Sequence, residues 1–237
     1  MFRDRVDAGR RLGAELEGRH IENDDVVVLG LPRGGVPVAF EVAQALGRPL
    51  DIIMVRKLGV PFQPELAMGA IGEAGVHILN HEVLQMAGIT EGEFEVVEQR
   101  ERAELERRSR LYRGNRPPLV LLGRTAVVVD DGIATGSTAR AACQVARALG
   151  ATRVLVAVPV ASRSSLAYLA DVCEQVVFLE APERFFAVGE WYRDFSPTSN
   201  EEVAALLQPA YRGATTPSAT ARSGDAPPIR DEDVEVR

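Results

Sequence analysis

Two adjacent carboxylates, Asp130 and Asp131, stand at the end of an apolar run and just before a loop of small residues. If a helix begins where this loop ends, its unpaired backbone N–H groups and partial positive charge can bind a phosphate. The carboxylates can accept hydrogen bonds from sugar hydroxyls. Glycines allow close backbone approach at 132 and 136, and hydroxyl donors follow at Thr135, Ser137 and Thr138. The segment therefore predicts a site for a ribose 5-phosphate group.

Other interpretations of this segment explain less of it. An ordinary strand–loop–helix with a capping serine accounts for Ser137, but not for two adjacent carboxylates after a buried strand. The phosphate loop of nucleoside triphosphatases needs Gly-Lys-Ser/Thr, whereas Gly136 is followed directly by Ser137. No Gly-x-Gly-x-x-Gly follows any predicted strand, so the dinucleotide fingerprint is absent from the sequence.

The cations give a second set of candidates. The chain has 27 basic residues, and Lys57 is the only lysine among them. Its ammonium is a compact point charge that an arginine guanidinium does not reproduce. Lys57 follows Arg56 at the end of one apolar run, and Arg33-Gly34-Gly35 follows another. Two interpretations stay open for Arg33 and Arg56: cations of a binding site, or solvated loop residues.

Alternating apolar runs and helical patterns must position these groups. Strands are predicted over 25–29, 52–55, 125–129, 154–160 and 176–179. Helices are predicted over 4–19, 36–46, 90–112, 137–149, 164–170 and 201–207, with a capping box at Thr90 and Glu93. A loop is expected over 56–64 and a hairpin over 66–79. This alternation predicts a parallel, doubly wound sheet, which binds ligands at the carboxyl ends of its strands.

Composition limits the class of protein. A chain of 237 residues with 46% hydrophobic residues can bury a full core. Its net charge of −7 argues against non-specific binding of nucleic acid. No apolar run approaches the roughly 20 residues of a membrane span, and no signal peptide is recognised, so a cytoplasmic protein is expected. Cys143 and Cys173 are expected to be core residues.

The segment from Val127 to Thr138 resembles the motif by which type I phosphoribosyltransferases bind phosphoribosyl pyrophosphate (PRPP). Further similarity runs from about residue 25 to 207 and includes 30–35, 55–59 and 64–70. The chain resembles a bacterial subfamily of such enzymes with an unassigned acceptor. The resemblance implies an α/β fold with a doubly wound, mostly parallel sheet, flanking helices and a small hood over the acceptor.

The resemblance also implies roles for individual residues. Asp130 and Asp131 would hold the ribose hydroxyls, with Asp131 counted among the catalytic residues. The pyrophosphate would lie against Arg33, Gly34 and Gly35, a loop that often has a non-proline cis peptide in this family, and against Arg56 and Lys57, both also counted as catalytic. The 5′-phosphate would bind the loop of Gly132, Ile133, Ala134, Thr135, Gly136, Ser137 and Thr138.

The implied reaction is transfer of the 5-phosphoribosyl group of PRPP to a nitrogen heterocycle, with release of pyrophosphate. Mg²⁺ is the implied cofactor, bound mainly to pyrophosphate oxygens; the candidate protein ligands are Asp130 and Asp131. Ala134 stands where the 6-oxopurine enzymes have an aspartate, which disfavours hypoxanthine and guanine. Glu65 and His77 are the candidate general acids or bases.

The acceptor should lie under the hood, expected over about 181–200, where Trp191 and Tyr192 are candidates to stack on a flat ring. Anchoring of this segment to the core is the alternative for both. The transferase domain is expected over 1–212, with an inserted helix over about 90–113 and a disordered tail over 213–237. Many members of the family are dimers, so a homodimer is implied.

Three functions fit the sequence to different degrees. A Mg²⁺-dependent phosphoribosyltransferase is favoured because three loops match in the right order. A regulator that senses PRPP without catalysis is the main alternative, and the intact Arg33-Gly34-Gly35 and Arg56-Lys57 loops disfavour it. An assembly factor whose tail recruits a partner is least favoured, since the tail has no apolar stripe.

Overall fold

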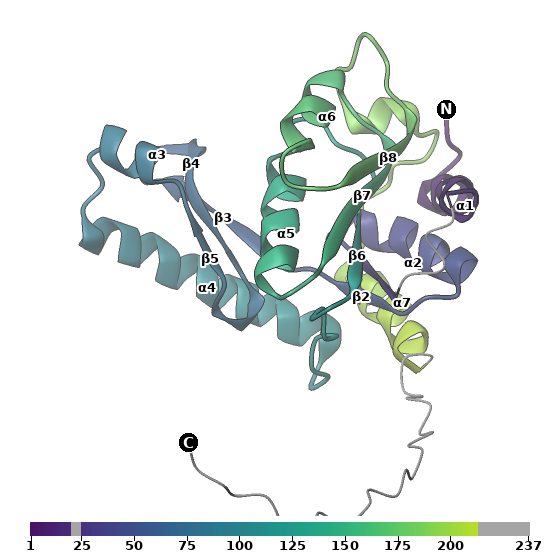
Figure 1. The fold of residues 1–237 in the computed structure, drawn as a ribbon, viewed down its shortest axis with the longest axis horizontal. Coiled ribbons are helices and arrows are strands. Elements are labelled where there is room, and N and C mark those ends of the chain that lie inside the picture. The colour runs from purple at the N-terminus through teal and green to yellow at the C-terminus, as the bar shows by residue number, and fades with distance from the viewer. Residues whose placement is uncertain (20–24, 213–237) are drawn as a thin grey trace, which may run out of the picture.

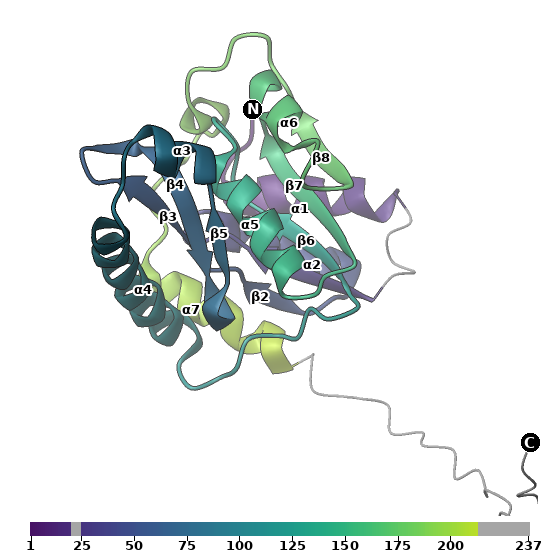
Figure 2. The ribbon, with the colours of Figure 1, turned by 60° about the vertical axis from the view of Figure 1, so that its left-hand side comes forward.

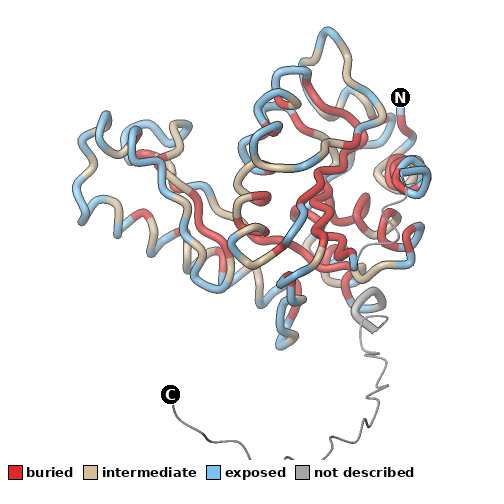
Figure 3. The backbone as a smooth tube through the Cα atoms, in the orientation of Figure 1, coloured by how far each residue is buried: buried red, intermediate tan, exposed pale blue. Residues whose placement is uncertain are grey.

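A five-stranded parallel sheet forms the centre of the protein in the computed structural model, which describes residues 1–19 and 25–212, the side chains of 209–212 excepted. Its strands run in the order β2-β1-β6-β7-β8. They are β1 (Val26–Gly30), β2 (Leu50–Ile52), β6 (Thr125–Val129), β7 (Arg153–Val160) and β8 (Gln175–Glu180). Every residue of β1 and β6 is buried (Figure 3), as expected of strands covered on both faces.

Helices cover both faces of this sheet (Figure 1). On one side lie α1 (Arg5–Glu17) and α2 (Gly35–Leu46), and on the other α5 (Ser137–Ala148) and α6 (Arg163–Leu169). The side chains of β1 alternate between the two layers: Val26 and Val28 pack with α1 and α2, and Val27 with Ala142 and Cys143 of α5. The predicted α/β class with a doubly wound parallel sheet is confirmed. Cys143 is buried and Cys173 half-buried, both in the α5 layer.

A second, antiparallel sheet is inserted between β2 and β6 (Figures 1 and 2). It has the order β3-β4-β5 and carries α3 (His81–Met86) and α4 (Glu91–Arg113). Its strands are β3 (Val55–Val60), β4 (Gln63–Gly72) and β5 (His77–Leu79), with a short 3₁₀ turn, η2 (Glu73–Gly75), at the predicted hairpin turn. The insert projects from the five-stranded sheet beside α5.

Two predictions for this region are wrong. The segment 56–64 is not a loop, because β3 pairs with β4 through almost its whole length, with register shifts on both sides of Gly59. Here a Cβ on Gly59 would come within 2.4 Å of the Pro64 carbonyl oxygen, so glycine serves close strand packing. The predicted strand 52–55 is split: β2 ends at Ile52, and the chain enters the second sheet at Val55.

A buried ion-pair cluster fixes the base of the insert. Arg113, the last residue of α4, donates from Nε to Asp51 Oδ1 of β2 at 2.7 Å and from Nη2 to the Ile52 carbonyl at 2.6 Å. Its Nη1 also contacts Glu73 of η2. The side chains of Arg113 and Asp51 are each only 4% exposed. One guanidinium thus ties the end of α4 to both sheets.

The remaining elements follow the last strand. Residues 181–187 are irregular, η3 (Val188–Trp191) is a 3₁₀ turn, and α7 (Asn200–Arg212) is longer than the predicted helix over 201–207. The capping box is confirmed, with Thr90 and Glu93 bonded reciprocally at the start of α4. The expected tail over 213–237 lies outside the described residues. No helix within 1–19 or 25–212 is long and apolar enough to span a membrane.

Candidate functional site

The carboxyl ends of β1 and β6 bring two of the predicted loops into contact. Leu31 N donates to the Val129 carbonyl at 2.9 Å. A Cβ on Gly35 would lie 2.7 Å from that carbonyl oxygen, and a Cβ on Gly34 only 2.0 Å from Asp131 Oδ2. Any side chain at these two positions would collide with the carboxylate-bearing segment. The Pro32–Arg33 peptide is cis, as the resemblance implies.

Asp130 and Asp131 are adjacent carboxylates in a half-buried position. The Asp131 N–H donates to Asp130 Oδ1 at 2.9 Å. Burial and, next, the charge of Asp131 raise the pKa of Asp130 well above the ordinary aspartate range. Both effects disfavour the ionised form of Asp130, and a carboxyl group whose pKa is shifted in this way is a candidate functional group.

Substitution of Asp130 should change the thermal stability of the folded chain and its dependence on pH. In the window above pH 3.8 the folded chain binds more protons at Asp130 than the unfolded chain does, so stability falls as the pH rises through it. We expect Asp130→Asn to raise the midpoint of thermal unfolding at neutral pH and to flatten its decline with pH. Asp25→Asn, at an exposed ion pair with Arg124, is the control. A lower midpoint for Asp130→Asn at neutral pH would contradict this account.

The loop over 132–138, predicted to bind the phosphate, is bonded to β7 and the residues after it, and its hydroxyl side chains are exposed. Ile133 N donates to the Val160 carbonyl at 2.9 Å, and Ser162 Oγ donates to the Ala134 carbonyl at 2.6 Å. Gly136 has a φ of +83°, which a side chain would strain, and α5 begins at Ser137 directly after it. Thr135, Ser137 and Thr138 are exposed, so their hydroxyls and the α5 N-terminus face the same space.

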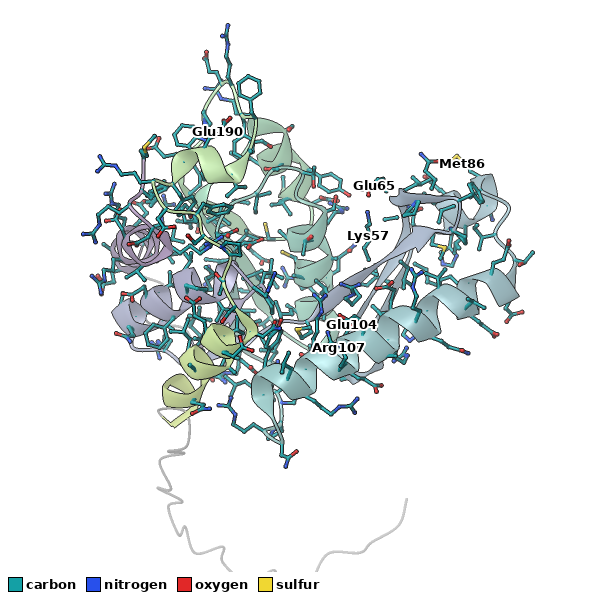
Figure 4. All side chains as sticks on the ribbon, turned by 180° about the vertical axis from the view of Figure 1, so that it is seen from behind. Lys57, Glu65, Met86, Glu104, Arg107 and Glu190 are labelled. Carbon is teal, nitrogen blue, oxygen red and sulfur yellow. The ribbon has the colours of Figure 1, made fainter. Side chains whose placement is uncertain are left out.

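Two of the predicted cations, Arg56 and Lys57, line a neighbouring cavity. A cavity of about 680 Å³ separates the N-terminal half of α5 from the inserted sheet, with Lys57, Asn80, His81, Ser137, Thr138 and Arg140 among its lining. Figure 4 shows Lys57 and Glu65 on the side of the insert that faces the five-stranded sheet. Lys57 Nζ lies 3.4 Å from Glu65 Oε2, and the Lys57 side chain is 40% exposed. Ser137 and Thr138 of the predicted phosphate loop thus line the same cavity as Lys57.

Arg56 and Arg33 differ from Lys57 in their surroundings. Arg56 donates from Nε and Nη2 to Glu101 Oε2 of α4 at 2.8 and 2.5 Å. Its guanidinium must leave Glu101, or share it, to contact a pyrophosphate. Arg33 is exposed at the Gly34–Gly35 loop. The catalytic role of Arg56 and the pyrophosphate role of both arginines stay predictions.

The aromatic segment after β8 closes one side of the site. The Tyr192 ring is buried between Phe2 and Phe195, with ring centroids 5.4 and 5.0 Å apart, and its hydroxyl donates to the Asp131 carbonyl at 2.6 Å. Burial, then the charge of Asp131, raises the pKa of Tyr192. Trp191 is half-buried in the same cluster. Tyr192 thus holds the backbone of Asp131, and contact of Trp191 and Tyr192 with an acceptor stays a prediction.

Sequence reasoning missed Arg5. Its Nε donates to Asp131 Oδ2 at 2.8 Å, and the two side chains are 12% and 14% exposed. Nothing in the sequence distinguishes Arg5 from the many other arginines, because it lies on a charged helix near the N-terminus, far from Asp131 along the chain. Only the packing of α1 beside the loop after β6 reveals the contact.

The candidate general acids and bases both lie on the insert. Glu65 is 96% exposed, and His77 contacts Arg102 and Glu98 of α4. Neither is in contact with the Asp130–Asp131 pair. His20 lies outside the described residues. Within 1–19 and 25–212 no group of three or more His, Cys, Asp or Glu side chains could hold a metal ion.

Comparison with known proteins identifies similar chains. The family model of the phosphoribosyl transferase domain matches residues 3–190. Two Mycobacterium tuberculosis proteins, from strains CDC 1551 / Oshkosh and H37Rv and both named "Putative phosphoribosyl transferase", are 52% identical over 236 residues. These matches cover 100% of this chain and 53% of each relative, so the chain spans about half the length of these curated relatives.

A solved structure shares the architecture. The protein TT1426 from Thermus thermophilus is 43% identical, with a TM-score of 0.80 and coverage of 87% of this chain and 97% of that one. The fold of this chain is therefore shared with a solved protein over most of the length of both chains.

Proposed function

The chain belongs to the phosphoribosyl transferase family, and from this premise we propose that it binds PRPP and transfers its 5-phosphoribosyl group to a small acceptor, releasing pyrophosphate. One observation carries the proposal most directly. The half-buried Asp130–Asp131 pair, the exposed hydroxyls of the 132–138 loop and the Gly34–Gly35 backbone all meet at one edge of the sheet. These are groups for ribose hydroxyls, a terminal phosphate and a closely approaching pyrophosphate, respectively.

The chain's own residues would act by position and charge. Asp131 and Asp130 would orient the ribose, and the α5 N-terminus with Ser137 and Thr138 would anchor the 5′-phosphate. Lys57, across the cavity, would stabilise negative charge on the departing pyrophosphate. The acceptor forms a bond to the anomeric carbon while the bond from that carbon to the pyrophosphate oxygen breaks. The pyrophosphate leaves with the electron pair of the broken bond.

Mg²⁺ fits this site only as a partner of the substrate. The carboxylates of Asp130 and Asp131 are hard oxygen ligands, but a raised pKa disfavours ionised Asp130 and Arg5 occupies one oxygen of Asp131. The ion typically keeps waters and binds one or two carboxylates plus substrate phosphates. When bound to the pyrophosphate it would neutralise charge on the leaving group.

Lys57→Arg should lower turnover about tenfold while leaving PRPP affinity nearly unchanged. Arginine keeps the charge, but its planar guanidinium does not replace a compact ammonium at the leaving group. Steady-state rates and calorimetric PRPP affinity are the two measurements. Arg140→Lys, across the same cavity, is a matched control for swapping the cation type. Equal turnover in Lys57→Arg and the unaltered chain would remove Lys57 from the reaction.

The decisive experiment is PRPP-dependent release of pyrophosphate with a panel of nucleobases and other nitrogen heterocycles. Release with one acceptor establishes the reaction and names the acceptor. A PRPP-sensing regulator is the second candidate, because Arg56, which lines the cavity, is bonded to Glu101. PRPP binding with no release across the panel would favour that regulator. Absence of PRPP binding by folded protein with Mg²⁺ would refute both.

A further inference from the structure

A chain of contacts links the N-terminal helix to the candidate ribose site. Arg5 reaches from the first turn of α1 to Asp131 Oδ2 at 2.8 Å, at the same oxygen that lies against the Gly34 backbone. The carboxylate of Asp131 thus lies between the guanidinium of Arg5 and the backbone of Gly34. Its orientation is set by these two neighbours and not by solvent.

Arg5 is itself held by the segment after β8. Its Nη1 donates to the Ser196 carbonyl at 2.7 Å, and its guanidinium lies 4.0 Å from the centre of the Phe195 ring. A planar guanidinium can make both contacts while it binds a carboxylate, which a lysine cannot do. The side chain therefore has little freedom to swing away from Asp131.

Backbone pairing fixes the two segments to each other. Phe2 N donates to the Trp191 carbonyl at 2.7 Å, Arg193 N to the Phe2 carbonyl at 2.9 Å, and Asp194 N to the Arg3 carbonyl at 2.9 Å. Residues 2–5 and 191–196 form one unit, which we call the cap. The cap donates two hydrogen bonds to Asp131: from Arg5 to its carboxylate and from Tyr192 to its carbonyl.

We propose that Arg5 is a positioning residue for the ribose: it fixes the Asp131 carboxylate so that Oδ1 meets a ribose hydroxyl, and it couples the cap to that contact. This inference rests on the proposed function and adds a residue to it from outside the matched loops. Arg5 does not touch the substrate. Loss of Arg5 should therefore affect ligands that contain a ribose and spare those that do not.

The test is a double-mutant cycle of Arg5→Gln and Asp131→Asn, read by calorimetry with Mg²⁺ and either PRPP or inorganic pyrophosphate. We expect Arg5→Gln to weaken PRPP binding about tenfold and to leave pyrophosphate binding within twofold of the unaltered chain. The double variant should bind PRPP no worse than Asp131→Asn alone, because Arg5 acts through Asp131. Arg5→Lys should recover part of the loss.

A matched control separates this role from general stabilisation. Arg10 lies on the same helix and pairs with Glu41 at 2.9 Å on the surface, so Arg10→Gln should leave PRPP affinity unchanged. The inference is overturned if Arg5→Gln lowers the melting midpoint but binds PRPP normally. It is also overturned if the losses of PRPP affinity in Arg5→Gln and Asp131→Asn add up in the double variant. Failure of the unaltered chain to bind PRPP would instead overturn the proposed function, and the ribose role with it.

Discussion

Asp131→Asn should weaken PRPP binding on the order of 100-fold. The substitution removes the charge of the carboxylate that is proposed to accept a hydrogen bond from a ribose hydroxyl, and hydrogen bonds to charged groups contribute about 1.5–3 kcal/mol each. One such bond at the upper end of this range, about 3 kcal/mol, corresponds to roughly 100-fold in affinity. The variant also leaves Arg5 without its carboxylate partner, which loosens the cap. Isothermal titration of PRPP into the Mg²⁺-containing protein measures the effect.

A control on the same sheet makes this result specific. Asp25 immediately precedes β1 at the opposite edge, is exposed, and pairs with Arg124. Asp25→Asn should therefore bind PRPP like the unaltered chain. If the folded Asp131→Asn variant binds PRPP as tightly as the unaltered chain, the Asp131 carboxylate does not hold the ribose.

Arg113→Met should produce the largest loss of stability, about 3–5 kcal/mol. Removal of the guanidinium leaves the carboxylates of Asp51 and Glu73 without their buried cation, and breaking one partner of a buried ion pair has an effect of this size. For a chain of this length the midpoint of thermal unfolding should fall by about 10 °C. Thermal and denaturant unfolding followed by circular dichroism measure the loss.

The matched control is Arg107→Met on the same helix. Arg107 pairs with Glu104 at 2.8 Å, and the Arg107 side chain is 60% exposed. We expect its midpoint to stay near that of the unaltered chain. A fall as large in Arg107→Met as in Arg113→Met would show that charge on α4, and not the buried cluster, stabilises the insert.

The sequence predicts most strands of the five-stranded sheet well, because a buried strand leaves a local signal in the sequence. A buried parallel strand reads as a continuous apolar run, and Thr125–Val129 is such a run. Caps are also local: Thr90 with Glu93 begins α4, and Gly47, with a φ of +60°, ends α2. Short-range composition is sufficient for both kinds of signal.

The insert is less predictable because pairing partners decide its structure. Residues 56–64 are rich in glycine and proline, yet β4 supplies the hydrogen-bonding edge that makes β3 a strand. Helix α3 was not predicted, although Asn80 caps it by accepting from Val83 N. That signal was present, and a search for capping side chains could have found it.

The candidate site divides in the same way. Its loops follow predicted strands, so topology alone places Gly34 beside Asp131. The contacts of Arg5 and Glu101 with predicted site residues depend on side-chain packing between distant elements. No short pattern in the sequence encodes those contacts. The acceptor class and the homodimer stay predictions.

The position of the insert has a consequence for synthesis of the chain. Strand β1 pairs with β6, as Val26 with Thr125 through Gly30 with Val129, so the middle of the sheet joins segments that the whole insert separates. Until Thr125–Val129 leaves the ribosome, β1 has only the short edge strand β2 beside it. Such non-local pairing slows folding and exposes an apolar edge meanwhile. The antiparallel insert, whose contacts are near in sequence, can form first and shorten the loop that β6 must close.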